Sequence, residues 1–360
     1  MAKGKKNTSA LHEMEGITPP PTSNPIAAKN IQERRKSSPS ATELLTQIVK
    51  GDPVALSRGI TLVESTAPKH QTQAKTLIQG CLPYANKSFR IGITGVPGVG
   101  KSTFIERFGN LLTQLGKKVA VLAVDPSSTV SKGSILGDKT RMEELVKNPH
   151  AFIRPSASGE SLGGVARKTR EAMILCEAAG FDILMIETVG VGQSETAVHS
   201  MTDFFLLLKL AGAGDELQGI KRGIMEMADA IVINKADGDN VKAAKLAKTE
   251  FNRALHLYPE KESGWIPKTL TCSAIKNEGI EAIWELMQAY EQEVKANGYF
   301  EEKRDQQNTF WLLQTIESAL KQNFYQQPTI QQALQKQLQL LKEHKTTPFE
   351  AAEVLLKLTT

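Results

Sequence analysis

The sequence predicts an α/β protein with a mostly parallel sheet that is covered by helices on both faces. Two observations predict this class. Between Phe89 and about Ala274, apolar runs of strand length alternate with helical stretches, as in chains that build parallel sheets. The runs do not alternate with polar residues, so both faces of the sheet should be covered. The six runs are FRIGIT, KKVAVLAVD, FDILMIET, DFFLLLKL, DAIVINK and IPKTLTCSA.

The chain divides into four predicted parts. Residues 1–38 form a basic tail that is rich in Pro, Ser, Asn and charge and has no apolar period, which is typical of disorder. Residues 39–88 form an N-terminal helical extension. Residues 89–278 form the α/β domain, and residues 279–360 form a C-terminal helical arm.

A helical spacing of apolar residues defines the two flanking parts. Beyond Ser40 this spacing continues past Gly51-Asp52-Pro53, which ends one helix and starts the next. A further helix should cover Lys69 to Leu82. The arm carries two stripes, Ile280, Ile283, Trp284 and Met287, then Phe310, Trp311, Leu312, Ile316 and Leu320. Because the second stripe forms an apolar patch, we expect a second copy to cover it in a homodimer.

Composition and charge exclude several classes of function. The chain has 360 residues, of which 40% are apolar, enough to bury a sizeable core. The formal net charge is +5, and the basic tail holds most of it, so the rest of the chain is nearly neutral. We therefore expect no nucleic-acid or membrane partner. No apolar run reaches the ~20 residues of a membrane span, and no secretory signal is evident, so we expect a cytoplasmic protein.

The three cysteines predict small buried side chains rather than a metal site. Cys81, Cys176 and Cys272 lie far apart in the sequence and share no CxxC or Cys/His spacing. Isolated thiols of this kind are typical of a reducing compartment.

A phosphate-binding loop follows the first apolar run. The stretch GVPGVGKST satisfies G-x-x-x-x-G-K-[ST] and lies between the strand FRIGIT and the helix STFIERFGNLLTQL, as this motif requires. Its glycines let backbone N–H groups surround phosphates, Lys101 reaches the β- and γ-phosphates, and Ser102 binds Mg²⁺. The residues are Gly95, Val96, Pro97, Gly98, Val99, Gly100, Lys101, Ser102 and Thr103. The sequence therefore predicts a nucleoside triphosphate site.

A second motif selects the base. The strand DAIVINKAD ends in Asn234, Lys235, Ala236 and Asp237, the pattern N-K-x-D. The Asp237 carboxylate can accept hydrogen bonds from guanine N1–H and the N2 amine, whereas adenine would leave it desolvated and unpaired. The next strand end adds Ser273, Ala274 and Ile275. We therefore expect GTP and GDP rather than ATP.

Three carboxylates are candidate groups for Mg²⁺ and its waters. Asp125 and Glu187 each close a predicted strand, so both should lie at the carboxyl edge of the sheet, where ligands of such folds bind. Glu187 with Gly190 forms E-x-x-G, where many GTPases have D-x-x-G, and a Glu can bind Mg²⁺ through a water. Asp138 lies in the loop SILGDKTRM. The alternatives are a helix cap for Glu187 and a helix N-cap for Asp138.

The residue that orients the attacking water is not evident. In Ras-like proteins a Gln directly follows the glycine of D-x-x-G. Here Val191 and Gly192 intervene before Gln193, which can equally be a polar residue at a helix start. We therefore expect slow intrinsic hydrolysis and a partner that sets the rate.

Six blocks of sequence resemble one family. GVPGVGKST, AVDPSS, GSILGDKTRM, ETVGVGQSE, AGAGDELQGIKRGIMEMAD and NKAD are similar, in this order, to the MeaB/ArgK family of P-loop GTPases, which includes the methylmalonic aciduria type A protein. The resemblance covers roughly residues 40–300. It implies a SIMIBI-type P-loop NTPase fold, an N-terminal helical extension and a C-terminal helical arm for homodimerisation.

The resemblance also implies a function and a set of roles. The implied function is a GTPase chaperone of adenosylcobalamin-dependent methylmalonyl-CoA mutase, gating cofactor delivery and protecting the mutase from inactivation. Asp125 and Asp138 correspond to the first switch and its Mg²⁺ shell, and Glu187 to the second switch. The block GAGDELQGIKRG resembles the third switch, in which Gln218 and Lys221 couple the nucleotide state to the partner.

The sequence departs from the family pattern in the first switch, and two alternative functions share parts of the pattern. Ser131 and Lys132 stand where the family's first switch has Thr and Gly, so Lys132 adds a charge near the phosphates. A nickel-inserting GTPase would share the sheet but should carry His-rich tracts or paired Cys/His ligands, which this chain lacks. An ATP-dependent kinase linked to amino-acid transport is disfavoured by N-K-x-D.

Overall fold

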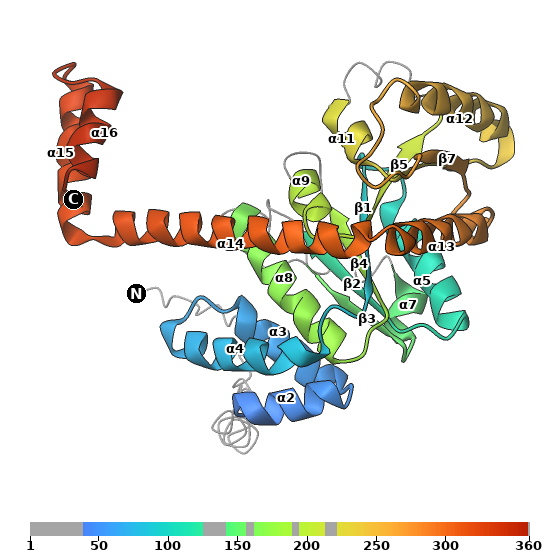
Figure 1. Cartoon of the computed structure of the whole chain (residues 1–360), viewed down its shortest axis with the longest axis horizontal. Helices are drawn as coiled ribbons and strands as arrows, with labels where there is room; N and C mark the ends of the chain where they lie inside the picture. Colours follow the sequence, from blue (N-terminus) through green and yellow to red (C-terminus); the bar gives the residue numbers. More distant parts are fainter. Residues whose placement is uncertain (1–38, 125–141, 156–161, 189–193, 213–221, 359–360) are drawn as a thin grey trace, which may run out of the picture. The chain divides into compact units, whose positions relative to one another are not determined.

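The computed structural model describes residues 39–124, 142–155, 162–188, 194–212 and 222–358, and their strands form one parallel sheet of order β3-β2-β4-β1-β5-β6-β7 (Figure 1). The predicted fold class is confirmed. The strands are β1 (Phe89–Gly95), β2 (Val119–Val124), β3 (Ala151–Arg154), β4 (Ile183–Thr188), β5 (Phe204–Leu210), β6 (Ala230–Asn234) and β7 (Lys268–Thr271). The strand β3 was not among the six predicted runs, because it is a four-residue edge strand that is only half-buried.

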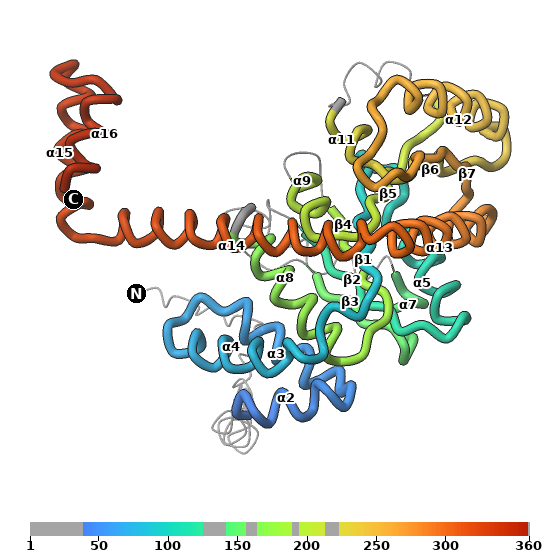
Figure 2. The backbone as a smooth tube through the Cα atoms, viewed as in Figure 1, coloured from blue at the N-terminus to red at the C-terminus, as the bar shows by residue number. Residues whose placement is uncertain are grey.

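Helices connect the strands and flank the sheet, as the tube in Figure 2 traces. The helices before β4 are α2 (Ala41–Val49), α3 (Pro53–Glu64), α4 (Pro68–Cys81), α5 (Lys101–Gln114), α7 (Glu143–Lys147) and α8 (Leu162–Ala178). Those after it are α9 (Ser194–His199), α11 (Arg222–Met227), α12 (Val241–Leu255), α13 (Ile280–Ala296), α14 (Tyr299–Gln326), α15 (Pro328–Lys342) and α16 (Pro348–Leu356). None of the described helices combines the length and hydrophobicity that a bilayer-spanning segment needs.

Both faces of the sheet are buried, as its apolar strands require. Every residue of β1, β2, β4 and β6 is buried. Alternate strand residues contribute to two opposite cores. One core contains side chains of α5 and α13, and the other contains side chains of α2, α3, α4 and α8. Side chains of α12 complete the second face beside β5 and β6.

The N-terminal extension begins as the sequence predicts. Gly51 has a φ of 83°, and the Asp52 carboxylate accepts a hydrogen bond from the Ala55 N–H at 2.7 Å, which caps α3 before Pro53. The helices α2, α3 and α4 pack on one another and on α8.

The first helix of the predicted arm belongs to the main core. The α13 side chains Ile283, Trp284 and Tyr290 are buried, and the Tyr290 hydroxyl donates to the Asp203 carbonyl at 2.9 Å. The spacing of apolar residues in a helix does not show which surface they pack against. The residues of α13 were therefore predicted as part of the C-terminal arm, residues 279–360. The boundaries at residues 38, 88 and 278 remain predictions.

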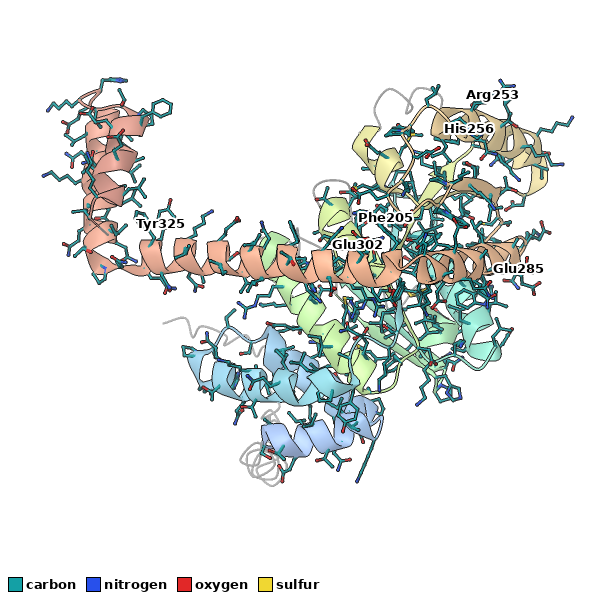
Figure 3. All side chains as sticks on the ribbon, viewed as in Figure 1. Phe205, Arg253, His256, Glu285, Glu302 and Tyr325 are labelled. Atoms are coloured by element: carbon teal, nitrogen blue, oxygen red, sulfur yellow. The ribbon has the colours of Figure 1, made fainter. Side chains whose placement is uncertain are left out.

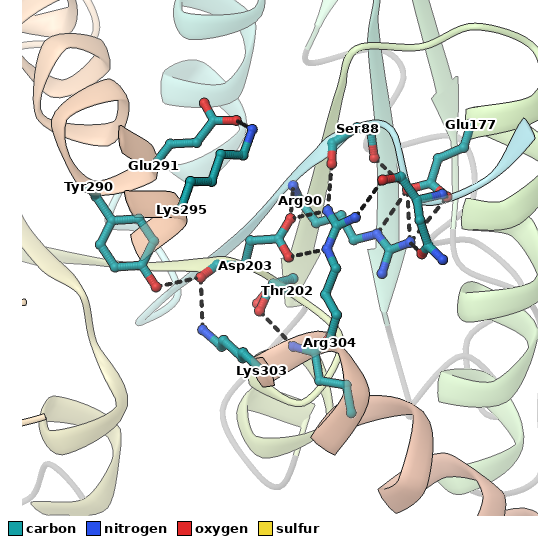
Figure 4. Close-up of polar contacts among 12 residues, drawn as sticks. Ser88, Arg90, Glu177, Thr202, Asp203, Tyr290, Glu291, Lys295, Lys303 and Arg304 are labelled. Atoms are coloured by element: carbon teal, nitrogen blue, oxygen red, sulfur yellow. Dashed lines mark hydrogen bonds and ion pairs between the residues drawn. The ribbon is translucent and has the colours of Figure 1, made fainter. Parts of the chain in front are cut away.

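Buried charges anchor the first turns of α14 (Figure 4). The Arg304 guanidinium forms an ion pair with Asp203 at 2.7 Å. Burial acts to lower the pKa of Arg304, but the hydrogen bonds to Asp203 and the nearby carboxylate charges together outweigh it, so the pKa is raised. Arg304 also donates to the carbonyls of Asn86 and Ser88, and Arg90 beside it pairs with Glu177 at 2.9 Å.

Farther along α14, the residues of the predicted apolar patch differ in their surroundings: Trp311 packs against the core, whereas Phe310 and Leu312 are exposed. The Trp311 indole N–H donates to the Ser200 carbonyl at 3.2 Å, and its ring lies 4.9 Å from the Arg170 guanidinium of α8. Trp311 therefore packs on the core rather than facing outward. Phe310 and Leu312 are exposed, as are Leu313, Ile316, Leu320 and Tyr325, the last labelled on α14 in Figure 3 with Glu302 nearer the start of the helix.

We expect the buried pair of Arg304 and Asp203 to be strongly stabilising. The substitution Arg304→Met leaves a buried carboxylate without its cation and should lower the free energy of unfolding by about 3–5 kcal/mol in urea titrations. The matched control Lys295→Met removes an exposed pair with Glu291 and should cost at most about 1 kcal/mol. Equal effects of the two substitutions would contradict this assignment.

Candidate nucleotide site

Two glycines shape the loop between β1 and α5. Gly95 has a φ of 156°, and a Cβ there would lie 2.6 Å from the Leu208 carbonyl of the neighbouring strand. Gly100 has a φ of 94°, and a Cβ there would lie 2.8 Å from the Asn234 side-chain nitrogen. Both positions therefore require glycine for their backbone conformation and for the close approach of a neighbour.

The predicted phosphate-binding lysine is the first residue of α5. The Lys101 ammonium donates to the Gly95 carbonyl at 2.7 Å, so the side chain folds back across the loop that follows β1. Ser102 is the next residue, in the first turn, where helix N–H groups lack intrahelical partners and the helix dipole favours anions. Loop, ammonium and helix start are thus arranged as a phosphate site.

The Asn234 side chain joins the two nucleotide motifs. Its amide nitrogen donates to the Val99 carbonyl at 2.8 Å, and its amide oxygen accepts from the Ala274 N–H at 3.2 Å and the Cys272 thiol at 3.4 Å. Asn234 is 2% exposed. The first residue of N-K-x-D therefore connects the phosphate loop to the segment after β7.

Asp237 is positioned by the serine of the next strand end. The Ser273 hydroxyl donates to Asp237 Oδ2 at 2.5 Å and accepts from the Lys276 N–H at 3.1 Å. The carboxylate Oδ1 accepts no hydrogen bond from any described residue. Lys235, between Asn234 and Asp237, adopts a φ of 56°. One carboxylate oxygen is held, and the other is available for a base edge.

Glu187 lies at the carboxyl edge, as the sequence predicts. It is 5% exposed, and its strand neighbours are Ile93 of β1 and Ala123 of β2. The next residue, Thr188, donates from its hydroxyl to Thr94 at 2.9 Å. Glu187 therefore lies on β4, between β1, which leads into the phosphate loop, and β2, which ends one residue before Asp125. Carboxylate and hydroxyl oxygens are the ligands that Mg²⁺ prefers, so Glu187 and Ser102 fit this ion.

Several predicted residues lie outside the described part of the chain. These are Asp125, Asp138 and Gln193, and also Gln218 and Lys221. Their roles remain predictions.

The cysteines are confirmed as buried free thiols. Burial raises the pKa of Cys81 to about 11 and that of Cys272 to about 12, and it also raises the pKa of Cys176. These thiols are therefore protonated at neutral pH and are poor metal ligands.

Sequence reasoning missed one buried cation near the site. Lys209 is 1% exposed in β5 and pairs in register with Ile233 of β6, one residue before Asn234. The available signal was a single lysine within the otherwise apolar run DFFLLLKL.

A parallel sheet with a phosphate-binding loop after β1 and N-K-x-D after β6 defines a P-loop GTPase. The comparisons with known proteins agree with this class. The family model described as "Methylmalonyl Co-A mutase-associated GTPase MeaB" matches residues 56–329. The chain belongs to this family of GTPases, as the resemblance predicted.

Curated relatives match most of the chain. The "Probable GTPase" of Mycobacterium tuberculosis is 47% identical over 88% of this chain and 94% of its own length. "GTPase ArgK" of Escherichia coli is 45% identical over 85% of this chain and 92% of its own length. The mouse "Methylmalonic aciduria type A homolog, mitochondrial" is 44% identical over 87% of this chain and 78% of its own length.

A solved structure shares the fold. The structure titled "Crystal structure of LAO/AO transport system kinase" superposes with a TM-score of 0.72 at 38% identity, and it covers 89% of this chain and 97% of that chain.

The contact between Gly100 and Asn234 gives a first test. Gly100→Ala places a Cβ against the Asn234 amide and should weaken GTP binding at least about tenfold in calorimetric titrations, because the amide loses its hydrogen bond to Val99. The control Gly116→Ala carries the same strain, since Gly116 has a φ of 78°, but its Cβ would meet nothing within 4 Å. If both variants bind GTP equally well, the contact is unimportant.

The choice of base gives a second test. Asp237→Asn presents an amide to guanine N1–H and should lower GTP affinity ~10²-fold or more. Wild-type protein should bind ATP far more weakly than GTP in the same calorimetric experiment. Equal binding of ATP and GTP by the wild type would exclude the role given to Asp237.

Proposed function

We propose that this GTPase is a chaperone of an adenosylcobalamin-dependent acyl-CoA mutase, methylmalonyl-CoA mutase, which gates adenosylcobalamin loading and protects the mutase from inactivation. The family description names a mutase-associated GTPase, and one relative is named for methylmalonic aciduria. The observation that carries the proposal is the arrangement around α9 and α11. The helix α9 begins at Ser194 within the block ETVGVGQSE, and α11 begins at Arg222 within the block GAGDELQGIKRG, the two blocks predicted to carry the second and third switches; the two helices contact each other.

The phosphate groups of GTP bind at the loop that follows β1. The backbone of Gly95 to Thr103 surrounds the phosphates, and the Lys101 ammonium exchanges the Gly95 carbonyl for phosphate oxygens. Ser102 and Glu187, with Asp125 and Asp138, would hold Mg²⁺. This ion supplies charge neutralisation on the phosphate oxygens when bound.

The base site reads guanine through one carboxylate. Asp237 Oδ1 accepts from the guanine edge while Ser273 holds Oδ2. The Asn234 side chain bonds both to the phosphate loop and to Ala274, so it keeps the segment of Ala274 and Ile275 beside that loop. Ile275 is 67% exposed and offers apolar surface at this end of the site. This carboxylate favours a GTPase over an ATP-dependent transport kinase.

Hydrolysis is slow without a partner in this proposal. Lys101 and Glu187 stabilise and organise the phosphates. Gln218 and Lys221, in the third predicted switch, respond to the nucleotide and to the mutase. A partner that selects one arrangement of this segment changes turnover without contacting the phosphate loop.

We further propose that α14 mediates a homodimer. Its exposed apolar residues Phe310, Leu313, Ile316 and Leu320 extend beyond the part that is anchored on the core. Exposed apolar side chains in such number along one helix are typical of an interface.

The chaperone role is tested by mutase-stimulated turnover. An adenosylcobalamin-dependent methylmalonyl-CoA mutase should raise GTP turnover about tenfold or more, and omission of Mg²⁺ should abolish turnover. Lys221→Ala should remove the stimulation and leave GTP affinity unchanged. The control Lys245→Ala removes an exposed lysine of α12 and should be stimulated fully. If no such mutase binds, the chaperone role fails and the GTPase remains; full stimulation of Lys221→Ala excludes only the third switch.

The dimer is tested on the exposed face of α14. Ile316→Lys with Leu320→Lys should convert a dimer to a monomer in sedimentation velocity, because two charges would be buried in the interface. The control Gln314→Lys with Ser318→Lys places the same charges at the same spacing on the opposite side of the helix. A wild-type chain that sediments as a monomer would refute the dimer.

A further inference from the structure

A cavity of about 520 Å³ lies at the amino edge of the sheet, beside the residues that precede β6. Its wall comes from the end of α9, from α11, from the segment between α12 and β7, and from the first turns of α14. The phosphate loop lies at the carboxyl edge, and the five residues of β6 separate the two edges by about 16 Å. The cavity is therefore distinct from the nucleotide site.

The floor of the cavity carries a net positive charge. The Lys261 ammonium lies 2.7 Å from Asp229 Oδ1, and the Lys303 ammonium lies 4.0 Å from Asp229 Oδ2. The nearby carboxylate of Asp203 forms an ion pair with Arg304, and its charge also acts on Lys303. Two lysines thus share the Asp229 carboxylate, and burial lowers the pKa of Lys303.

Both ammonium groups retain N–H donors. Lys261 donates to the Met227 carbonyl and to Asp229, which uses two of its three N–H groups. Lys303 donates to the Asp203 carbonyl at 2.8 Å, and the side chains of Lys261 and Lys303 are 18% and 11% exposed. The floor can therefore donate further hydrogen bonds to an anion.

Two other ionisable side chains that line the cavity, His199 and Tyr299, are neutral at neutral pH. Burial and the charge of Lys303 lower the pKa of His199 to about 4, and burial raises the pKa of Tyr299 to about 12. At neutral pH neither side chain adds a charge to the floor. The protonated Tyr299 hydroxyl adds a further hydrogen-bond donor to the lining.

The wall is apolar and the mouth is acidic. Met225, Leu255, Pro259 and Pro267 contribute apolar surface to the cavity. The exposed carboxylates of Glu226, Glu260 and Glu262 lie on its rim. A ligand that fills the cavity therefore meets cations inside, apolar surface along its body and negative charge at its outer end.

We propose that this cavity is a binding site for a small apolar monocarboxylate. The carboxylate would accept charge-assisted hydrogen bonds from Lys261 and Lys303, and the apolar body would pack on the wall. The volume suits a small organic acid. The acidic rim would repel a second carboxylate at the far end of the ligand, so the site selects monoacids over diacids.

Fluorine NMR on the full-length chain tests this proposal with 4-fluorophenylacetate as the probe. Its resonance should broaden on addition of protein, and an excess of phenylacetate should restore the line width. Phenylacetamide lacks the charge, and 1,4-phenylenediacetate carries a second carboxylate, so neither should displace the probe. Absence of broadening, or equal displacement by all three compounds, would overturn the proposal.

Two independent variants locate the binding. Lys261→Met should weaken binding at least about tenfold, and the control Lys245→Met removes an equal charge outside the cavity and should bind normally. Gly223→Phe fills the cavity from α11, where an added Cβ meets nothing within 4 Å, and should also abolish binding while leaving both lysines intact. If Lys261→Met does not fold, Gly223→Phe decides; normal binding by Gly223→Phe would place the probe elsewhere and refute the site.

Discussion

The nucleotide site depends on the side chain of Asn234, which joins its two sequence motifs. The buried amide nitrogen donates a hydrogen bond to the Val99 carbonyl of the phosphate loop, and the amide oxygen accepts one from the Ala274 N–H beyond β7. The two halves of the nucleotide site are therefore fixed relative to each other by one residue. The glycine at position 100 follows from the same contact, because the Asn234 amide occupies the space that a Cβ would need.

A second set of buried polar contacts joins the core to α14. The Asp203 carboxylate forms an ion pair with Arg304, while Lys303 and Tyr290 donate hydrogen bonds to the Asp203 backbone carbonyl. Asp203 follows α9, which itself begins after a predicted switch. The helix α9 and the segment between α9 and β5 therefore connect the carboxyl end of β4 to the helix proposed for dimerisation, since Trp311 of α14 also donates to the Ser200 carbonyl.

The sequence predicted what depends on local pattern and missed what depends on strand order. The glycines of the loop and the lysine at the helix start have fixed spacing, so the phosphate site was predictable. The bond from Asn234 to Val99 requires β6 to lie two strands from β1, which no local pattern states. Trp311 was predicted to lie in an exposed patch, because helical spacing alone does not show which surface a side chain packs against. The strand β3 was not predicted, because its four residues AFIR are few and only half-buried.

The amino edge of the sheet helps to place Asn234 correctly at the other edge. Asp182, Asp203 and Asp229 each directly precede a strand. Each carboxylate accepts a backbone N–H from a neighbouring segment, from Lys118 at 2.7 Å, from Arg90 at 2.8 Å and from Phe205 at 2.9 Å, respectively. These bonds favour one pairing register for β4, β5 and β6. A slip of one residue would turn every side chain of a strand to the opposite face. In β6 such a slip would remove the Asn234 amide from Val99, so the aspartates at one edge support the nucleotide site at the other.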